Sequence, residues 1–298
     1  MSETAKKVGE RRASREALLE WYGKMVETHK SLPEEKKKEL DEWERANLNG
    51  QTIETSDWPG WEELIGKKPD VSAFARQNFR DQRICKITTG ETPIQSHNDK
   101  PYTVLHIIPA RAFDPTIKIN LSSLKLETDR LKPIQGFTWS PKYEADGLLT
   151  VARDEGVDYS YLKIFNSGIA EAVNASLLRR RDRRLLIPST DFETELFEVL
   201  LHVRSIQKEL GVEMPLFILL SLIGLRGYEI GYDRERYEFD VHPIEQDDLL
   251  VPEVFIESYE EVVDKVMRPV FDTVWRACGA PGSPNFNESS EWRPAPGL

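Results

Sequence analysis

The chain has 298 residues, of which 39% are hydrophobic and 31% charged, and its net charge is −11 at pH 7. This composition excludes collagenous, coiled-coil and wholly disordered proteins. The length suits one large domain, or a main domain of roughly 200 residues with an appendage. Two cysteines cannot form a disulfide framework or a four-cysteine zinc site. An acidic chain disfavours charge-driven binding to DNA, although the middle third is locally basic.

Neither a membrane segment nor a secretory signal is expected. The longest apolar run, residues 214–225, is shorter than the ~20 residues that a helix needs to cross a bilayer. The first twenty residues contain basic side chains but no apolar stretch of the kind that a signal peptide requires. We therefore expect a cytoplasmic protein.

Residues 1–70 predict a small helical arm that is rich in tryptophan. Apolar side chains recur at helical spacing over residues 16–26, and a second helix is expected to begin at Pro33, with Ser31 or Leu32 just outside it. Large rings on a short segment usually dock it onto a core, and less often onto a partner. Three tryptophans are therefore candidate partner-binding residues: Trp43, Trp58 and Trp61.

Residues 71–280 predict an α+β domain, separated from the arm by the breaker at residues 67–70. Residues 71–89 have helical periodicity, whereas residues 102–109 are β-branched and apolar, as in a strand buried on both faces. Residues 117–121 predict a short edge strand or an extended segment before a helix. The clearest pattern is an antiparallel meander of three strands over residues 147–152, 159–165 and 169–173.

The C-terminal half continues this pattern of helices and strands. We expect a long helix from Asp191 to Leu210, ended by Gly211, and then a central strand over residues 215–223. A single edge strand over residues 249–256 and a helix over residues 259–277 follow. The domain is thus predicted to hold a mixed, largely antiparallel sheet with helices packed on it. Residues 281–298 are rich in proline, serine and asparagine, which predicts a disordered tail.

No sequence motif identifies catalytic or cofactor-binding residues. The five histidines lack metal-ligand spacing, and the chain has no Walker A sequence, no G-x-G-x-x-G after a strand and no G-x-S-x-G. His106 lies inside an apolar strand, where a core histidine is more common than a ligand. No cofactor is therefore expected.

One row of acidic side chains is a candidate metal site. A divalent ion or acid/base chemistry would use carboxylates and an imidazole on one helix face. The spacing i, i+4, i+7 and i+11 places four such residues there: Asp191, Glu195, Glu198 and His202. The alternative, which we favour, is the solvated face of an amphipathic helix whose apolar stripe is complete without them.

Two groups of arginines are candidate contacts to nucleic acid, because a guanidinium binds phosphate through two hydrogen bonds. They are Arg76, Arg80 and Arg83 on the helix predicted over residues 71–89, and Arg179, Arg180, Arg181, Arg183 and Arg184 after the meander. No aromatic side chains alternate with the second group. We therefore favour a solvated loop, or a partner of the acidic last third, over a phosphate-binding site.

Several segments resemble a known family. They are residues 73–93, 104–109, 146–149, 162–173 and 217–228. In order, they are similar to the C-terminal region of bacterial proteins that carry an N-terminal Schlafen-type AlbA domain and are described as DNA-binding or ATP-binding. The resemblance covers about residues 71–278. It implies a bacterial, cytoplasmic protein working in defence or mobile-element biology.

The resemblance does not include the AlbA domain itself. The residues before 71 form the tryptophan-rich arm, with no glycine-rich strand pair, so no functional residue is carried over. We therefore expect a non-enzymatic binding, adaptor or regulatory subunit that contacts a protein partner or a second copy of itself. The alternatives are a nucleic-acid-associated protein that uses the arginines at 179–184 and, third, a metal-dependent hydrolase that uses the carboxylate row.

Overall fold

The computed structural model describes residues 27, 30–38, 71–94, 101–124, 128–181, 184–233 and 237–294. The predicted helix over residues 16–26 and the tryptophans at 43, 58 and 61 lie outside these residues. The chain divides into two compact units, Met1–Gln77 and Asn78–Leu298. This division lies within helix α4 (Val71–Thr88), whereas the sequence predicted a boundary at residues 67–70.

The second unit is built on an eight-stranded sheet in the described part of the chain. Its strands lie in the order β10-β8-β1-β5-β4-β3-β2, and β11 also pairs with β8. Every pairing is antiparallel, which confirms the predicted α+β class. The strands are β1 (Tyr102–Pro109), β2 (Trp139–Glu144), β3 (Gly147–Asp154), β4 (Val157–Phe165), β5 (Ala170–Asn174), β8 (Leu216–Ile223), β10 (Asp248–Leu250) and β11 (Val254–Ile256).

A smaller sheet of three strands lies outside this order. It contains β6 (Arg179–Arg181), β7 (Arg184–Pro188) and β9 (Tyr228–Gly231), and β7 pairs with β9 in parallel. Two short 3-10 helices, η2 (Leu121–Ser123) and η3 (Thr128–Leu131), connect β1 to β2. Residues 117–120 are therefore an extended lead-in to a helical turn, one of the two alternatives that the sequence left open.

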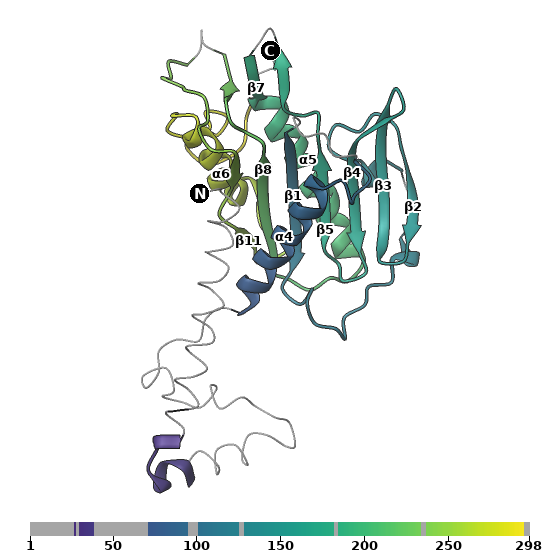
Figure 1. Cartoon of the computed structure of the whole chain (residues 1–298), viewed down its shortest axis with the longest axis vertical. Coiled ribbons are helices and arrows are strands. Elements are labelled where there is room, and N and C mark those ends of the chain that lie inside the picture. Colours follow the sequence, from purple (N-terminus) through teal and green to yellow (C-terminus); the bar gives the residue numbers. More distant parts are fainter. Residues whose placement is uncertain are drawn as a thin grey trace. The chain divides into compact units, whose positions relative to one another are not determined.

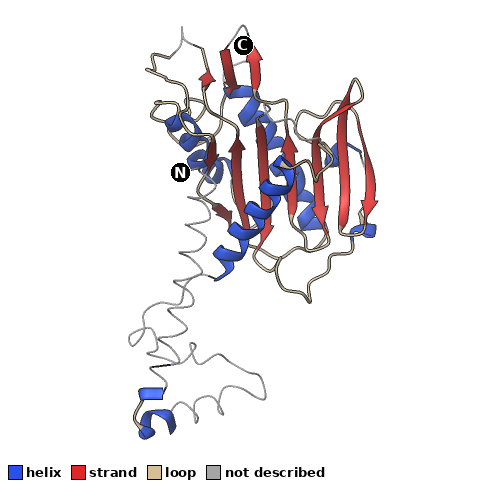
Figure 2. Cartoon of the chain, viewed as in Figure 1, coloured by secondary structure: helices blue, strands red, loops and turns tan. Residues whose placement is uncertain are grey.

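Helices cover both faces of the main sheet (Figures 1 and 2). Helices α5 (Ser189–Glu209) and α6 (Val263–Ala277) pack on one face, where they form the largest apolar core with alternate strand residues such as Leu105 and Ile107. Helix α4 crosses the other face and covers the intervening residues, such as Val104. Because successive side chains of a strand point to opposite faces, His106 of β1 also lies on the α4 side.

Most predicted elements are present, although β2, β6, β7 and β9 were not predicted and two elements of the last third differ from their predictions. The predicted meander forms β3, β4 and β5, and the predicted central strand forms β8. The edge strand expected over residues 249–256 is instead two short strands, since Pro252 between them cannot donate a ladder hydrogen bond. The last helix begins at Val263 rather than at residue 259, and it includes Pro269.

The C-terminal segment differs more from its prediction. Residues 281–294 are described and pack against α5 and α6, whereas their composition predicted disorder. Polar side chains of this segment form hydrogen bonds with the buried carboxylate of Glu193 on α5. Donors on the segment are Ser283 Oγ at 2.7 Å, Asn285 Nδ2 at 2.8 Å and Trp292 Nε1 at 2.9 Å. Backbone groups of Ser283 and Trp292 also donate to Asp272 and Asp264 of α6. Composition cannot reveal this order, because it depends on side chains that are distant in the sequence.

None of the described helices combines the length and the apolar character that crossing a lipid bilayer requires.

Candidate functional site

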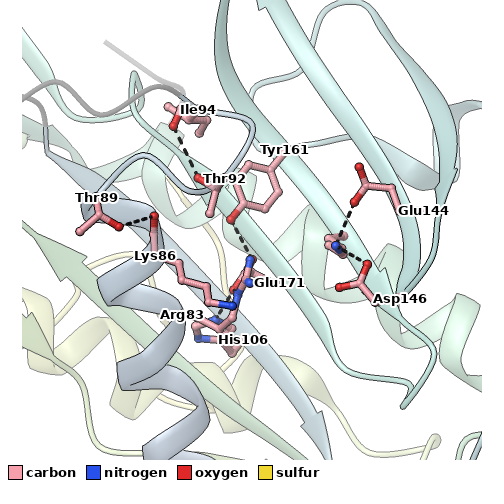
Figure 3. Close-up of polar contacts among 11 residues, drawn as sticks. Arg83, Lys86, Thr89, Thr92, Ile94, His106, Glu144, Asp146, Tyr161 and Glu171 are labelled. Atoms are coloured by element: carbon pink, nitrogen blue, oxygen red, sulfur yellow. Dashed lines mark hydrogen bonds and ion pairs between the residues drawn. The ribbon is translucent and has the colours of Figure 1, made fainter.

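A buried cluster of charged and polar side chains lies between α4 and the sheet. At its centre is Glu171 of β5, which stands directly opposite His106 of β1 in the strand register. Arg83 of α4 donates two hydrogen bonds to the Glu171 carboxylate, at 2.7 and 2.6 Å. His106 Nε2 lies 2.9 Å from Glu171 Oε2, and the Tyr161 hydroxyl of β4 donates to Glu171 Oε1 at 2.7 Å. Figure 3 shows the three side chains meeting at this carboxylate.

The electrostatics of the cluster favour an ionised Glu171. Burial alone would raise the pKa of this carboxyl, but the hydrogen bonds from His106 and Arg83 outweigh burial and hold the pKa at about 2. Burial raises the pKa of the Tyr161 hydroxyl well above its usual value, and the charge of Glu171 raises it further. The cluster therefore holds one ion pair, Arg83 with Glu171, and a neutral phenol.

The chemistry of this cluster is structural, and we call its four residues the clamp: Arg83, His106, Tyr161 and Glu171. An ionised carboxylate can only accept hydrogen bonds, so Nε2 of His106 carries the proton that points at Glu171. Glu171, His106 and Tyr161 are fully buried, and no solvent or ligand reaches them while α4 is in place. His106 is thus a core histidine, as its apolar strand suggested. Removing one member of a buried ion pair leaves the other charge uncompensated, so the clamp ties α4 firmly to the sheet.

Five phenylalanines surround one end of this cluster, and we call them the phenylalanine patch: Phe79, Phe113, Phe165, Phe217 and Phe255. Phe79 of α4 contacts the rings of His106, Phe113 and Phe165 at centroid distances of 5.5, 6.1 and 5.8 Å. Phe79, Phe165 and Phe217 pack on the same buried group, which includes Ile108 and Leu219. The Phe217 ring lies 5.9 Å from that of Phe255.

The outer members of the phenylalanine patch are accessible to a partner. Phe113, in the loop after β1, is 40% exposed, and Phe255, on β11, is 49% exposed. Each exposed ring touches a more buried one, Phe113 on Phe79 and Phe255 on Phe217. Apolar surface that extends over several side chains marks interaction sites, whereas single exposed apolar residues are ordinary. The clamp supports the patch from below, since Arg83 lies over the Phe165 ring at 5.3 Å.

Carboxylates border the phenylalanine patch on two sides. Lys163 lies over the Phe165 ring at 5.0 Å and contacts two carboxylates, Glu144 at 2.9 Å and Asp146 at 2.7 Å. Figure 3 shows both carboxylates pointing at this amine. Arg111, two residues before Phe113, likewise contacts Asp114 at 2.9 Å and Glu213 at 3.3 Å. Arg111 is therefore shared by two carboxylates, whereas a second cation, Lys142, lies 3.6 Å from Glu144 beside Lys163.

The arginines of α4, which were candidate contacts to nucleic acid, have partners within the protein. Arg83 holds Glu171, and Arg80 Nε lies 3.2 Å from Asp81 Oδ1. Arg76 is buried and donates to Ser72 Oγ at 3.1 Å. A phosphate would have to displace these contacts, and for Arg83 it would also have to open the buried clamp.

The second arginine group forms part of the smaller sheet. Arg179, Arg180 and Arg181 make up β6, and Arg184 begins β7. The Arg184 guanidinium donates to Glu229 at 2.6 Å, which is the pairing with the acidic last third that the sequence suggested as an alternative. Arg183 and the side chains of Arg179–Arg181 lie outside what the structure describes.

The carboxylate row of α5 supports a loop instead of assembling a metal site. Glu195 accepts a hydrogen bond from the Gln135 backbone N–H at 2.6 Å, and Glu198 contacts Lys132 at 2.9 Å. Within the described residues, no group of three or more His, Cys, Asp or Glu side chains is placed to hold a metal ion. Asp191 lies in the first turn of α5 and His202 further along it, so the row does not converge on one point.

Comparisons with protein-family models, curated proteins and solved structures gave no match to this chain. The resemblance to the C-terminal region of the Schlafen-type AlbA proteins therefore remains a prediction. Sequence reasoning missed both the clamp and the phenylalanine patch. A polar residue in each of two apolar strands, His106 and Glu171, was the one available signal that they meet.

Proposed function

We propose that this chain is a protein-binding module that docks another protein on the phenylalanine patch. The observation that carries the proposal is a surface where five phenylalanine rings gather and two of them, Phe113 and Phe255, are 40% and 49% exposed. Aromatic side chains are enriched at the centres of protein interfaces, where few residues supply most of the binding energy.

Rigidity of the supporting structure favours the same role. Phe79 and Phe165 rest against the buried clamp, and Phe217 lies on β8, a strand that pairs along its whole length with β1. A surface that is already shaped loses little conformational entropy on binding. The resembled bacterial proteins carry this region beside a separate DNA-binding or ATP-binding domain, which is consistent with an accessory binding role.

Site-specific photocrosslinking tests the proposal. A photoreactive phenylalanine analogue is placed at position 113 or 255, and the full chain is expressed and irradiated in the cells that encode it. Both positions should crosslink to the same protein. The control position is Tyr143 on β2, which is 49% exposed and lies outside the patch. Absence of a crosslink at 113 and 255, or equal crosslinking at 143, would contradict the proposal.

A further inference from the structure

The charges around the phenylalanine patch narrow the chemistry of its partner. Asp146 and Glu213 are 59% and 65% exposed, and each shares its cation with a second carboxylate. Glu253 and Glu257 stand two residues before and two residues after Phe255. The apolar surface is therefore bordered by carboxylates on the side of Phe113, on the side of Phe165 and at β11.

Aromatic faces add to this preference. The face of a phenylalanine ring attracts a cation, and Lys163 already lies 5.0 Å from the centroid of Phe165. The more exposed rings, Phe113 and Phe255, can accept further cations from outside. A partner with apolar side chains flanked by lysine or arginine would complement both the rings and the surrounding carboxylates.

We infer that the phenylalanine patch binds a basic amphipathic segment of another protein. This inference rests on the proposed function and specifies its partner. The acidic border disfavours a second copy of this chain, because the chain carries a net charge of −11 and its acidic borders would face each other. The same carboxylates repel anionic lipid and nucleic-acid phosphate, so those surfaces are excluded as partners of this patch.

The first experiment compares two model peptides of about 14 residues, or four helical turns. One carries leucine on one helical face and lysine on the other, and the second replaces every lysine by glutamate. Binding of each labelled peptide to the full chain is measured by fluorescence anisotropy near physiological ionic strength. The lysine peptide should bind at least about tenfold more tightly than the glutamate peptide.

A matched pair of variants locates the binding. Phe113→Ser with Phe255→Ser should weaken binding of the lysine peptide about tenfold, because two half-exposed rings no longer contribute buried area. The control is Phe137→Ser, which removes a ring that is 88% exposed before β2 and outside the patch. The control should leave the affinity unchanged, and circular dichroism checks that every variant is folded.

A second pair tests the charges while leaving the phenylalanines in place. Asp146→Asn with Glu213→Gln should weaken the lysine peptide several-fold and reduce the dependence of its affinity on salt. The control variant, Glu155→Gln with Glu288→Gln, removes the same net charge at exposed positions elsewhere. If both variants weaken the lysine peptide equally, the attraction depends on net charge alone, and the inference is overturned.

Other outcomes also decide the matter. Equal binding of the two peptides, binding of neither, or patch-dependent binding to vesicles of anionic phospholipid would each reject a basic peptide partner. These results leave the proposed function standing if positions 113 and 255 still crosslink to one protein. Loss of those crosslinks removes the proposed function itself, whatever the peptides do.

Discussion

Two buried glutamates on opposite sides of the sheet are stabilised in different ways. Glu171, on the α4 side, is paired with the guanidinium of Arg83. Glu193, on the α5 side, accepts four hydrogen bonds from neutral donors, including Trp275 Nε1 at 2.9 Å. Hydrogen bonds satisfy both carboxylates, but only Glu171 has a full positive charge beside it.

The pKa values of the two carboxyls record this difference. Burial raises the pKa of Glu193, and its neutral donors offset only part of that effect. Burial acts on Glu171 in the same direction, yet His106 and Arg83 reverse it and the pKa falls to about 2. His106 and Arg83 together thus overcome the cost of burying the Glu171 carboxylate, whereas the neutral donors around Glu193 do not overcome the same cost.

The largest expected effect comes from breaking the ion pair at Glu171. Glu171→Gln leaves Arg83 largely buried without its carboxylate, and we expect a loss of about 3–5 kcal/mol in the free energy of unfolding. Urea unfolding of the full chain, followed by circular dichroism, measures the loss. The double variant Glu171→Gln with Arg83→Met removes both charges and should be more stable than the single variant. If the double variant is less stable, the stranded charge is not the cause.

Lowering the pH should change the contributions of Glu171 and Glu193 to the free energy of unfolding in opposite directions. The pKa of Glu171 is about 2 in the folded protein, below the value of about 4.3 in the unfolded chain. Ionised Glu171 therefore contributes about 3 kcal/mol to the free energy of unfolding above about pH 4.3, and this contribution is lost as the pH falls toward 2. The folded pKa of Glu193 is raised, so its contribution is present below about 4.3 and lost as the pH rises through the folded pKa.

Urea unfolding at a series of pH values compares the wild-type chain with Glu171→Gln and Glu193→Gln. On acidification from about pH 7 to about pH 3, the stability difference should shrink for the first variant and grow in favour of the wild type for the second. Parallel changes for the two variants would contradict the assignment of a cation to one glutamate and of neutral donors to the other.

Glu193→Gln should cost less than Glu171→Gln at neutral pH. The amide group of glutamine would face donors such as the indole N–H of Trp275 or Trp292, which leaves polar groups unpaired but strands no charge. We expect a loss of about 1–3 kcal/mol, measured by urea unfolding. The C-terminal segment should also become more sensitive to protease, and an unchanged cleavage pattern would argue that Glu193 does not hold it.

The smallest effect is expected at an exposed ion pair. Arg184→Ala removes the contact with Glu229, where the arginine side chain is 52% exposed, and solvent screens such pairs strongly. The free energy of unfolding should change by less than about 1 kcal/mol. If the loss were as large as that of Glu171→Gln, burial would not explain the difference between the ion pairs of Arg83 and Arg184.

Local spacing in the sequence predicted most of the helices and strands of the second unit, but not β2, β6, β7 or β9. The meander of β3, β4 and β5 and the long helix α5 follow from periodicity and turn residues that act within a few positions. The sequence also placed Arg83 on a polar stripe of α4, but a stripe does not say what it faces. Its partner Glu171 lies 88 positions away, and only the pairing of β1 with β5 brings it to His106.

Tertiary structure decided which charged and polar groups meet. The acidic row on α5 was visible in the sequence, yet the approach of Lys132 and of the Gln135 backbone turned two of its members into supports for a loop. The C-terminal segment has the composition of a disordered tail, yet contacts with α5 and α6 order it, among them three hydrogen bonds to the buried carboxylate of Glu193. The physical reason is the same in each case: backbone propensity acts between neighbours in the chain, whereas burial and charge act between neighbours in space.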